Sequence, residues 1–237
     1  FIAIWEYFFP WFRAEDEKEK IDRDGIESSG TSLERAIIGL CSPPKLLDYI
    51  ENFILYHKET QKIIAQNHQF IGVNKAIESF ANRGAKDGKL GVFWHTQGSG
   101  KSFSMIFYTR KITRKLTGNF TFVIITDRDD LDRQIHLNFL NTEAVKKADA
   151  AQPKNSAQMR EFLSQNKPII FTLIQKFRYD KGKKYPILSD RNDIIVIVDE
   201  AHRTQYKSLA FTGTPLLGKD RKTHTWFGRP TISKKRD

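Results

Sequence analysis

The spacing of apolar and polar positions changes near residue 90, and the two parts of the chain predict different elements. Beyond this point, short apolar runs alternate with segments in which apolar residues recur every three or four positions. The runs predict strands at 90–94, 120–126, 168–172, 194–198 and 209–212. The segments between them predict helices at 102–116, 129–140 and 156–165. Strands that alternate with helices are typical of an α/β fold with a doubly wound parallel sheet.

The part before residue 90 is predicted to be mainly helical. Residues 31–34 have the pattern of a helix-capping box, and Ser42-Pro43-Pro44 predicts the start of a helix that continues through Tyr56. A further helix is expected over 68–85. The aromatic stretch 1–12 predicts either a strand packed on the chain's own core or a docking surface for another domain. We therefore expect a linker and helical region over 1–66 and an α/β domain over 67–237.

Composition limits the classes of protein to which the chain can belong. Its 237 residues suffice for one α/β domain with an appendage. A single cysteine, Cys41, excludes a disulfide framework and a cysteine-based zinc cluster. The net charge of +11 favours a polyanionic partner such as nucleic acid. No apolar run approaches the ~18 residues needed to cross a bilayer, and no secretory signal is recognisable, so we expect a cytoplasmic protein with no membrane partner.

The most specific motif is HTQGSGKS, residues 95–102, which lies between a predicted strand and a predicted helix. Phosphate groups are bound by backbone N–H groups at the start of a helix, and Gly98 and Gly100 let the backbone approach them closely. Lys101 is expected to reach the β- and γ-phosphates, and Ser102 to hold Mg²⁺. The motif therefore predicts a site for ATP and Mg²⁺ formed by Gly98, Ser99, Gly100, Lys101 and Ser102.

A second motif, IIVIVDEAH, ends a predicted strand with two carboxylates. The carboxyl ends of parallel strands meet at one edge of a sheet, so these carboxylates are expected beside the phosphate-binding loop. Asp199 is predicted to coordinate Mg²⁺ through water, and Glu200 to orient or activate the attacking water. His202 has two interpretations, a contact that couples the ATP site to nucleic acid or an ordinary packed side chain.

The third motif, FTGTP, contributes Thr212, Gly213 and Thr214 at the end of the last predicted strand. Together with the two motifs before it, it resembles the segment that links the ATP site to the nucleic-acid track in superfamily 2 helicases and translocases of the DEAH-box type. The resemblance implies that the α/β domain has a RecA-like P-loop NTPase fold.

Longer stretches make the resemblance closer. FWHTQGSGKS, TDRDDLDRQ, IIFTLIQKF and DEAHRTQY resemble the motor of the R (restriction) subunit of type I restriction–modification enzymes. That family also tends to lack the usual first glycine of the phosphate-binding motif, where this chain has His95. The family implies a subunit that moves duplex DNA with two RecA-like lobes, cuts it with a separate nuclease domain, and works with methylation and specificity subunits.

The resemblance also implies roles for further residues. Gln69, in NHQF, is expected to recognise adenine; the alternative is an ordinary glutamine on a helix surface. Hydroxyl, amide and cationic side chains are the usual partners of DNA phosphates. Such contacts are expected at Thr126, Arg128, Thr172, Gln175 and Lys176.

Two expectations concern what the sequence lacks. The chain begins with Phe1 and stops soon after FTGTP, so we expect a fragment without the nuclease domain and the second lobe, which binds ATP·Mg²⁺ but hydrolyses it poorly. Parallel neighbouring strands need a connection of about a dozen residues or more. Few residues separate His202 from Leu209, so we also expect a segment to be missing near 206–208.

The favoured function is that of an ATP-dependent duplex-DNA translocase from a type I restriction enzyme. One alternative is a superfamily 2 helicase that separates strands of DNA or RNA, in which the TDRDDLDRQ and DEAHRTQ stretches are not both expected. A second alternative is a nucleotide-binding assembly module without catalysis, against which the intact Lys101, Asp199 and Glu200 argue.

Overall fold

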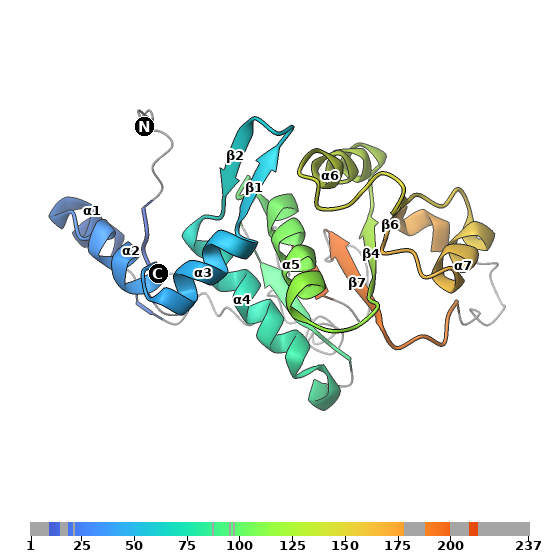
Figure 1. Ribbon diagram of the computed structural model, residues 1–237, viewed down its shortest axis with the longest axis horizontal. Coiled ribbons are helices and arrows are strands. Elements are labelled where there is room, and N and C mark those ends of the chain that lie inside the picture. The colour runs from blue at the N-terminus through green and yellow to red at the C-terminus, as the bar shows by residue number, and fades with distance from the viewer. Residues whose placement is uncertain are drawn as a thin grey trace, which may run out of the picture.

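The computed structural model describes residues 10–14, 19–20, 22–86, 88–94, 96, 98–177, 188–199 and 209–212. These residues form an arm of helices, a small hairpin and an α/β domain (Figure 1). The arm comprises α1 (Arg23–Ser29), α2 (Ser32–Leu40) and α3 (Pro43–Asn52). No helix in the described ranges is both long and apolar enough to cross a membrane.

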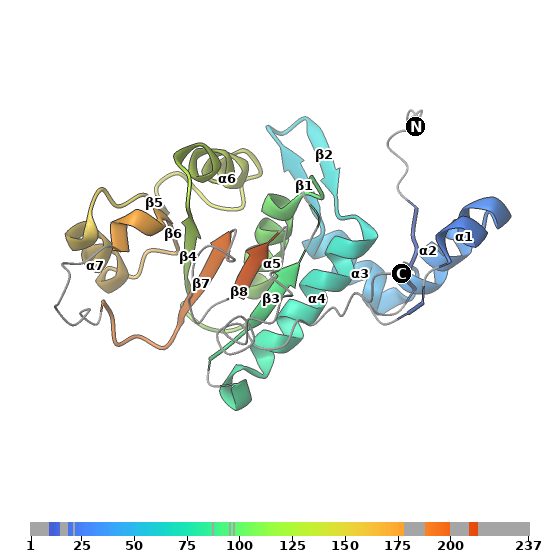
Figure 2. The same cartoon turned by 180° about the vertical axis from the view of Figure 1, so that it is seen from behind.

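The α/β domain is built on one sheet whose paired strands are all parallel, in the order β3–β8–β7–β4–β6–β5. Figure 2 shows β8 between β3 and β7. The five predicted strands are confirmed, with ends that differ by at most one residue. A sixth, β5, is too short to leave a pattern in the sequence. The strands are β3 (Gly91–Trp94), β4 (Thr121–Thr126), β5 (Ala150–Ala151), β6 (Ile169–Leu173), β7 (Ile194–Asp199) and β8 (Leu209–Thr212).

Helices cover both faces of the sheet, which confirms the doubly wound architecture. Along β4, Phe122 and Ile124 pack with one set of helices, whereas Val123 and Ile125 pack with α7 on the opposite face. Because successive side chains of a strand point to opposite faces, a strand covered on both sides carries a continuous apolar run, as β4 does at 122–125. The helices are α4 (Asn67–Ala81), α5 (Lys101–Lys115) and α6 (Asp129–Asn141) on the first face and α7 (Ser156–Ser164) on the second.

The predicted helix over 43–56 is wrong in its last turn. α3 ends at Asn52, and Ile54–His57 is instead strand β1, which pairs with the antiparallel strand β2 (Gln61–Ile64). The turn between the two strands has three residues, 58–60, and Lys58 and Glu59 have φ angles of 51° and 62°, in the left-handed region. Neither residue is one of the usual turn signals, so the hairpin left no mark in the pattern of the sequence.

The predicted capping box at residues 31–34 is also wrong. Thr31 precedes α2, but its side chain makes no capping hydrogen bond. The neighbouring hydroxyl of Ser32 has a different partner: its Oγ accepts a hydrogen bond of 2.8 Å from the backbone N–H of Trp11. The Thr31 hydroxyl instead lies 3.3 Å from the Ser29 hydroxyl.

The described part of the aromatic stretch 1–12 packs on the chain's own core. Trp11 is buried, with its ring 6.1 Å from that of Tyr49 and 6.0 Å from that of Phe70. Gly39 of α2 lies directly beneath, since a Cβ built there would come within 2.6 Å of Trp11 Nε1. The core interpretation is therefore confirmed for Trp11, while residues 1–9 lie outside the described residues.

β7 and β8 are parallel neighbours, as the missing-segment hypothesis requires. β7 ends at Asp199 and β8 begins at Leu209, so the connection is confined to 200–208, which lies outside the described residues. The missing segment itself stays a prediction.

Candidate nucleotide-binding site

The three sequence motifs meet at the carboxyl edge of the sheet. β8 lies between the strand that precedes the phosphate-binding loop and the strand that carries the acidic motif. In register, Thr212 lies opposite Trp94, and Phe211 lies opposite Asp199. Segments separated by about a hundred residues thus end side by side, at the edge where parallel α/β sheets bind their ligands.

The phosphate-binding loop has the backbone that its glycines predict. Gly98 and Gly100 have φ angles of 81° and 77°, in the left-handed region that favours glycine. Gly100 directly precedes α5, so the first N–H groups of that helix lie at the loop. Such groups are not bonded within the helix and carry partial positive charge, which suits them to phosphate oxygens. A Cβ built on Gly98 would meet nothing within 4 Å, so the loop is open there.

Two side chains of α4 hold this loop from behind. His68 Nε2 lies 3.1 Å from the carbonyl oxygen of Ser99, and Gln69 Nε2 donates a hydrogen bond of 3.0 Å to the carbonyl oxygen of Gly100. Gln69 is buried, and its Oε1 accepts from the backbone N–H of Gln66 in a capping box. The helix-surface alternative for Gln69 is therefore wrong, and its recognition of adenine stays a prediction.

The residues present fit a magnesium–nucleotide pair. Ser102 lies in the first turn of α5, and its hydroxyl makes no hydrogen bond to other described residues. Asp199 is buried at the end of β7. Within the described ranges, no group of three or more His, Cys, Asp and Glu side chains could hold a metal alone. A magnesium ion here would be held by Ser102, Asp199 and phosphate oxygens. Lys101, in the same first turn of α5 as Ser102, would neutralise phosphate charge.

Several predicted site residues cannot be placed. Ser99 and Thr212 lie at the loop and at the edge of the sheet, but only the backbone of Thr212 is described. The residues outside the described ranges are His95, Glu200, His202, Gly213 and Thr214.

The two threonines predicted to contact DNA are both buried. Thr126 ends β4, and its hydroxyl lies 3.4 Å from Asp132 Oδ1. Thr172, in β6, has a buried hydroxyl with no hydrogen-bond partner in the described part of the chain. Neither hydroxyl is exposed to solvent. Contact of either one with DNA therefore stays a prediction, and it would require the carboxyl edge of the sheet to rearrange.

The other predicted DNA-binding side chains lie on two loops that touch each other. Arg128 is exposed and forms a two-pronged ion pair with Asp130, with distances of 3.1 and 2.6 Å. Gln175 Nε2 donates a hydrogen bond of 2.8 Å to the carbonyl oxygen of Asp127, and Lys176 Nζ donates one of 2.7 Å to that of Pro153. The loops after β4 and β6 therefore form one surface beside the nucleotide site.

A network centred on Asp132, not anticipated from the sequence, supports this surface. Asp132 accepts from Gln152 Nε2 at 3.1 Å in addition to its contact with Thr126. Burial raises the pKa of the Asp132 carboxyl above its ordinary value, although Lys176 and Gln152 act in the opposite direction. The folded state thus disfavours the ionised carboxylate relative to the unfolded state.

We expect Asp132→Asn to stabilise the protein at neutral pH. The cost of ionising Asp132 is present above its raised folded pKa and disappears below the unfolded value of about 3.9. The gain in free energy of unfolding should therefore be measurable by urea denaturation at pH 7 and vanish near pH 3. Asp129→Asn, an exposed change on the same helix, is the control. A gain for Asp132→Asn that is equal at both pH values would contradict the assignment.

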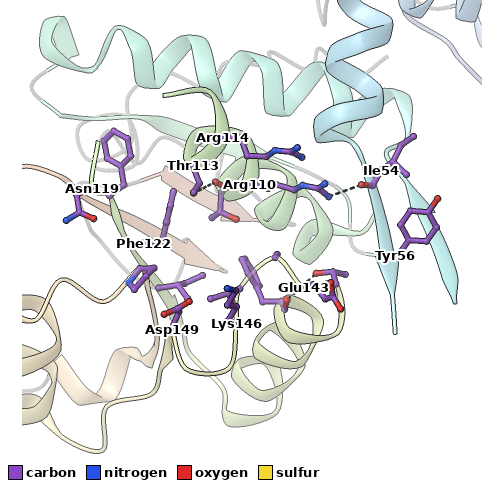
Figure 3. Close-up of a pocket in the computed structure, with 18 of the residues that line it drawn as sticks. Ile54, Tyr56, Arg110, Thr113, Arg114, Asn119, Phe122, Glu143, Lys146 and Asp149 are labelled. Carbon is purple, nitrogen blue, oxygen red and sulfur yellow. Dashed lines mark hydrogen bonds between the residues drawn. The ribbon is translucent and has the colours of Figure 1, made fainter. Parts of the chain in front are cut away.

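A cleft of about 880 Å³ lies at the opposite, amino edge of the sheet (Figure 3). Arg110 and Arg114 of α5 line it on one side, and Glu143, Lys146 and Asp149 line it on the other. Arg110 Nη1 donates a hydrogen bond of 2.8 Å to the carbonyl oxygen of Ile54 and so fixes the hairpin to the α/β domain. None of the predicted site residues lines this cleft.

Comparison with known proteins agrees with the fold and the motifs. The SWI2/SNF2 ATPase family matches residues 68–234. The type I restriction enzyme HindI endonuclease subunit of Haemophilus influenzae is 38% identical and its alignment covers 96% of this chain. The putative type I restriction enzyme MjaIXP endonuclease subunit of Methanocaldococcus jannaschii is 34% identical over 94% of the chain. The chain spans 24% of the length of each of these two relatives.

Among solved structures, the UvsW helicase from bacteriophage T4 is similar in fold, with a TM-score of 0.55 and 15% sequence identity. The similarity covers 79% of this chain and 66% of the helicase. It supports the helicase-like RecA fold predicted from the motifs. The predicted resemblance to type I restriction enzymes is confirmed by the two endonuclease subunits. The chain belongs to the SWI2/SNF2 ATPase family.

Proposed function

We propose that this chain is the first motor lobe of a type I restriction enzyme R subunit and couples ATP hydrolysis to the movement of duplex DNA. The observation that carries the proposal is the register of the sheet. β8, which leads into FTGTP, lies between the strand of the phosphate-binding loop and the strand of Asp199. The strand in which FTGTP begins is therefore paired with both strands of the proposed nucleotide site. A conformational change at the nucleotide can reach it directly.

Each residue of the proposed ATP site has its own role. Backbone N–H groups of the loop and the start of α5 hold the phosphates, and Lys101 neutralises their charge. Ser102, and Asp199 through water, would hold Mg²⁺, which would polarise the phosphates when bound. Glu200 would orient the attacking water, and Gln69, which lies beside the loop, would recognise adenine.

DNA binds beside this edge, on the surface formed by the loops after β4 and β6. Arg128, Gln175 and Lys176 belong to these loops. The net charge of +11 attracts a polyanion in general, and the relatives named as endonuclease subunits support DNA in particular. Further contacts, either to DNA or between the ATP site and DNA, are proposed for Thr126, Thr172, His202, Thr212, Gly213 and Thr214.

The parent protein is proposed to contain more than this lobe. It would carry a nuclease domain and a second RecA-like lobe, and it would work in the cytoplasm with methylation and specificity subunits.

We also infer that an internal segment of the family's lobe is missing near 206–208. Supporting this, the alignment with the Haemophilus influenzae subunit extends over 263 residues, more than the 237 of this chain. Val92, Ile194 and Val196, on the second face of the sheet, are only partly buried. A crossover segment between β7 and β8 would cover apolar residues of this kind.

The function is tested by two displacement assays on the intact parent protein. A translocase of duplex DNA should displace a third strand from a triplex in an ATP-dependent manner and leave the duplex itself paired. A strand-separating helicase would release single strands from a forked duplex. Release of single strands without triplex displacement would contradict the proposal in favour of a helicase, and no activity in either assay would favour an assembly module.

A further inference from the structure

Three consecutive side chains at the start of α4 form hydrogen bonds with two segments that are far apart in the sequence. Asn67 binds the N-terminal segment, defined here as Trp11–Ala14, whereas His68 and Gln69 bind the phosphate-binding loop. All three lie in the first turn of a helix whose Asn67 and Gln69 are buried. We propose that Asn67, His68 and Gln69 act as positioning residues that couple the docking of the N-terminal segment to nucleotide affinity. This inference rests on the proposed ATP site.

The grip on the N-terminal segment is specific. Asn67 Oδ1 accepts a hydrogen bond of 3.0 Å from the backbone N–H of Arg13, and Asn67 Nδ2 donates one of 2.9 Å to the carbonyl oxygen of the same residue. The amide thus occupies both polar groups of one residue, as a neighbouring strand would. Only a side chain with a donor and an acceptor in this geometry can do so.

The segment is also held at other points. The N–H of Trp11 is bonded to Ser32 Oγ, and the carbonyl oxygen of Phe12 accepts from Arg35 Nη1 at 3.2 Å. The ring of Trp11 is buried against Tyr49 and Phe70, and Phe70 is the residue that follows Gln69. Docking of Trp11 therefore bears directly on the first turns of α4.

The grip on the loop fixes the groups that would bind phosphate. In a trans peptide the C=O group and the next N–H group point in opposite directions. Holding the carbonyl oxygens of Ser99 and Gly100 against α4 therefore points the N–H groups of Gly100 and Lys101 away from α4. The Gly100 carbonyl oxygen also accepts from the N–H groups of Phe103 and Ser104, so α4 reinforces an orientation that α5 begins. Because the two N–H groups belong to the predicted phosphate cradle, nucleotide binding depends on that orientation.

The chemistry of the two loop contacts is consistent with a fixed position. Because the partner of His68 Nε2 is a carbonyl oxygen, Nε2 must carry the proton. Gln69 Nε2 lies 2.9 Å from where a Cβ of Gly100 would be, so only glycine lets the glutamine amide approach this closely. Gln69 Oε1 is anchored in turn by the N–H of Gln66, which leaves the amide little freedom to swing.

The coupling is tested in the 237-residue chain with ADP·Mg²⁺ as ligand. Because coupling between two sites is reciprocal, ADP·Mg²⁺ should slow amide hydrogen exchange at Trp11–Ala14, measured by mass spectrometry. Asn67→Asp keeps the acceptor for the Arg13 N–H but places a second acceptor against the Arg13 carbonyl oxygen. Ser32→Ala loosens the same segment at Trp11 without touching α4. Both variants should weaken ADP·Mg²⁺ binding, Asn67→Asp by about fivefold or more.

Asn119→Asp is the matched control, because that side chain is exposed and makes no hydrogen bond within the described ranges. Its affinity for ADP·Mg²⁺ should equal that of the unchanged chain. Unaltered affinity in Ser32→Ala, or exchange at Trp11–Ala14 that is the same with and without nucleotide, would overturn the coupling while leaving the ATP site intact. No binding of ADP·Mg²⁺ by the unchanged chain would overturn the proposed site and this inference together.

Discussion

Replacing Phe53 with alanine is expected to lower the free energy of unfolding by about 3–5 kcal/mol. The Phe53 ring is fully buried, with ring centroids 4.8 Å from Phe70 and 5.6 Å from Phe107. It stacks on Tyr49 as well, so it joins α3, α4 and α5 in one aromatic cluster. The loss comprises the transfer free energy of the ring and the cavity left behind, a large part of the 5–15 kcal/mol that stabilises a typical domain.

The measurement is urea denaturation of the chain followed by circular dichroism. Leu47→Ala, in the helix that Phe53 follows, is the control, because Leu47 is 66% exposed, and its effect should stay within about 0.5 kcal/mol. A loss of less than about 1 kcal/mol for Phe53→Ala would mean that the arm is not joined to the α/β domain through this cluster.

Lys101→Ala is expected to weaken binding of ATP·Mg²⁺ by about 10- to 100-fold, as measured by titration calorimetry. The physical reason is the loss of a charge-assisted hydrogen bond to phosphate, worth about 1.5–3 kcal/mol. Lys101 opens α5 directly after Gly100, so its charge lies at the end of the helix that faces the phosphates. Its removal leaves the backbone N–H groups in place, which is why some binding should remain.

Lys115→Ala is the control for Lys101→Ala. Lys115 ends the same helix, where it pairs with Glu51 on the surface. Removing it changes net charge by the same amount and should not alter ATP affinity. Equal weakening by both variants would show that general electrostatic attraction, rather than a contact at the loop, accounts for the effect.

Most of the α/β fold could be predicted because its strands are buried on both faces. A strand such as β4 has an unbroken apolar run at 122–125, and a helix such as α5 begins at a glycine-rich loop, so the two patterns are easily distinguished. The β1–β2 hairpin could not be predicted. Ile50, Phe53 and Ile54 keep helical spacing across the boundary between α3 and β1, and Lys58 and Glu59 do not signal the turn.

The candidate site could be predicted only as far as its motifs extend. The sequence around Gly98, Gly100 and Lys101 carries its own chemistry, since each residue type is needed locally. The supports behind the loop could not be inferred, because His68 and Gln69 reach it across about thirty residues of chain. The contacts of Asp132 with Thr126 and Gln152 are likewise a product of packing rather than of any local pattern.

ATP turnover by the intact parent protein, with and without long duplex DNA, tests the central claim most directly. The account predicts strong stimulation by duplex DNA, little by single strands or RNA, and loss of all turnover in a Lys101→Ala variant. Stimulation by single strands or RNA alone would contradict the translocase in favour of a strand-separating helicase. Absence of turnover with every nucleic acid would contradict the motor itself.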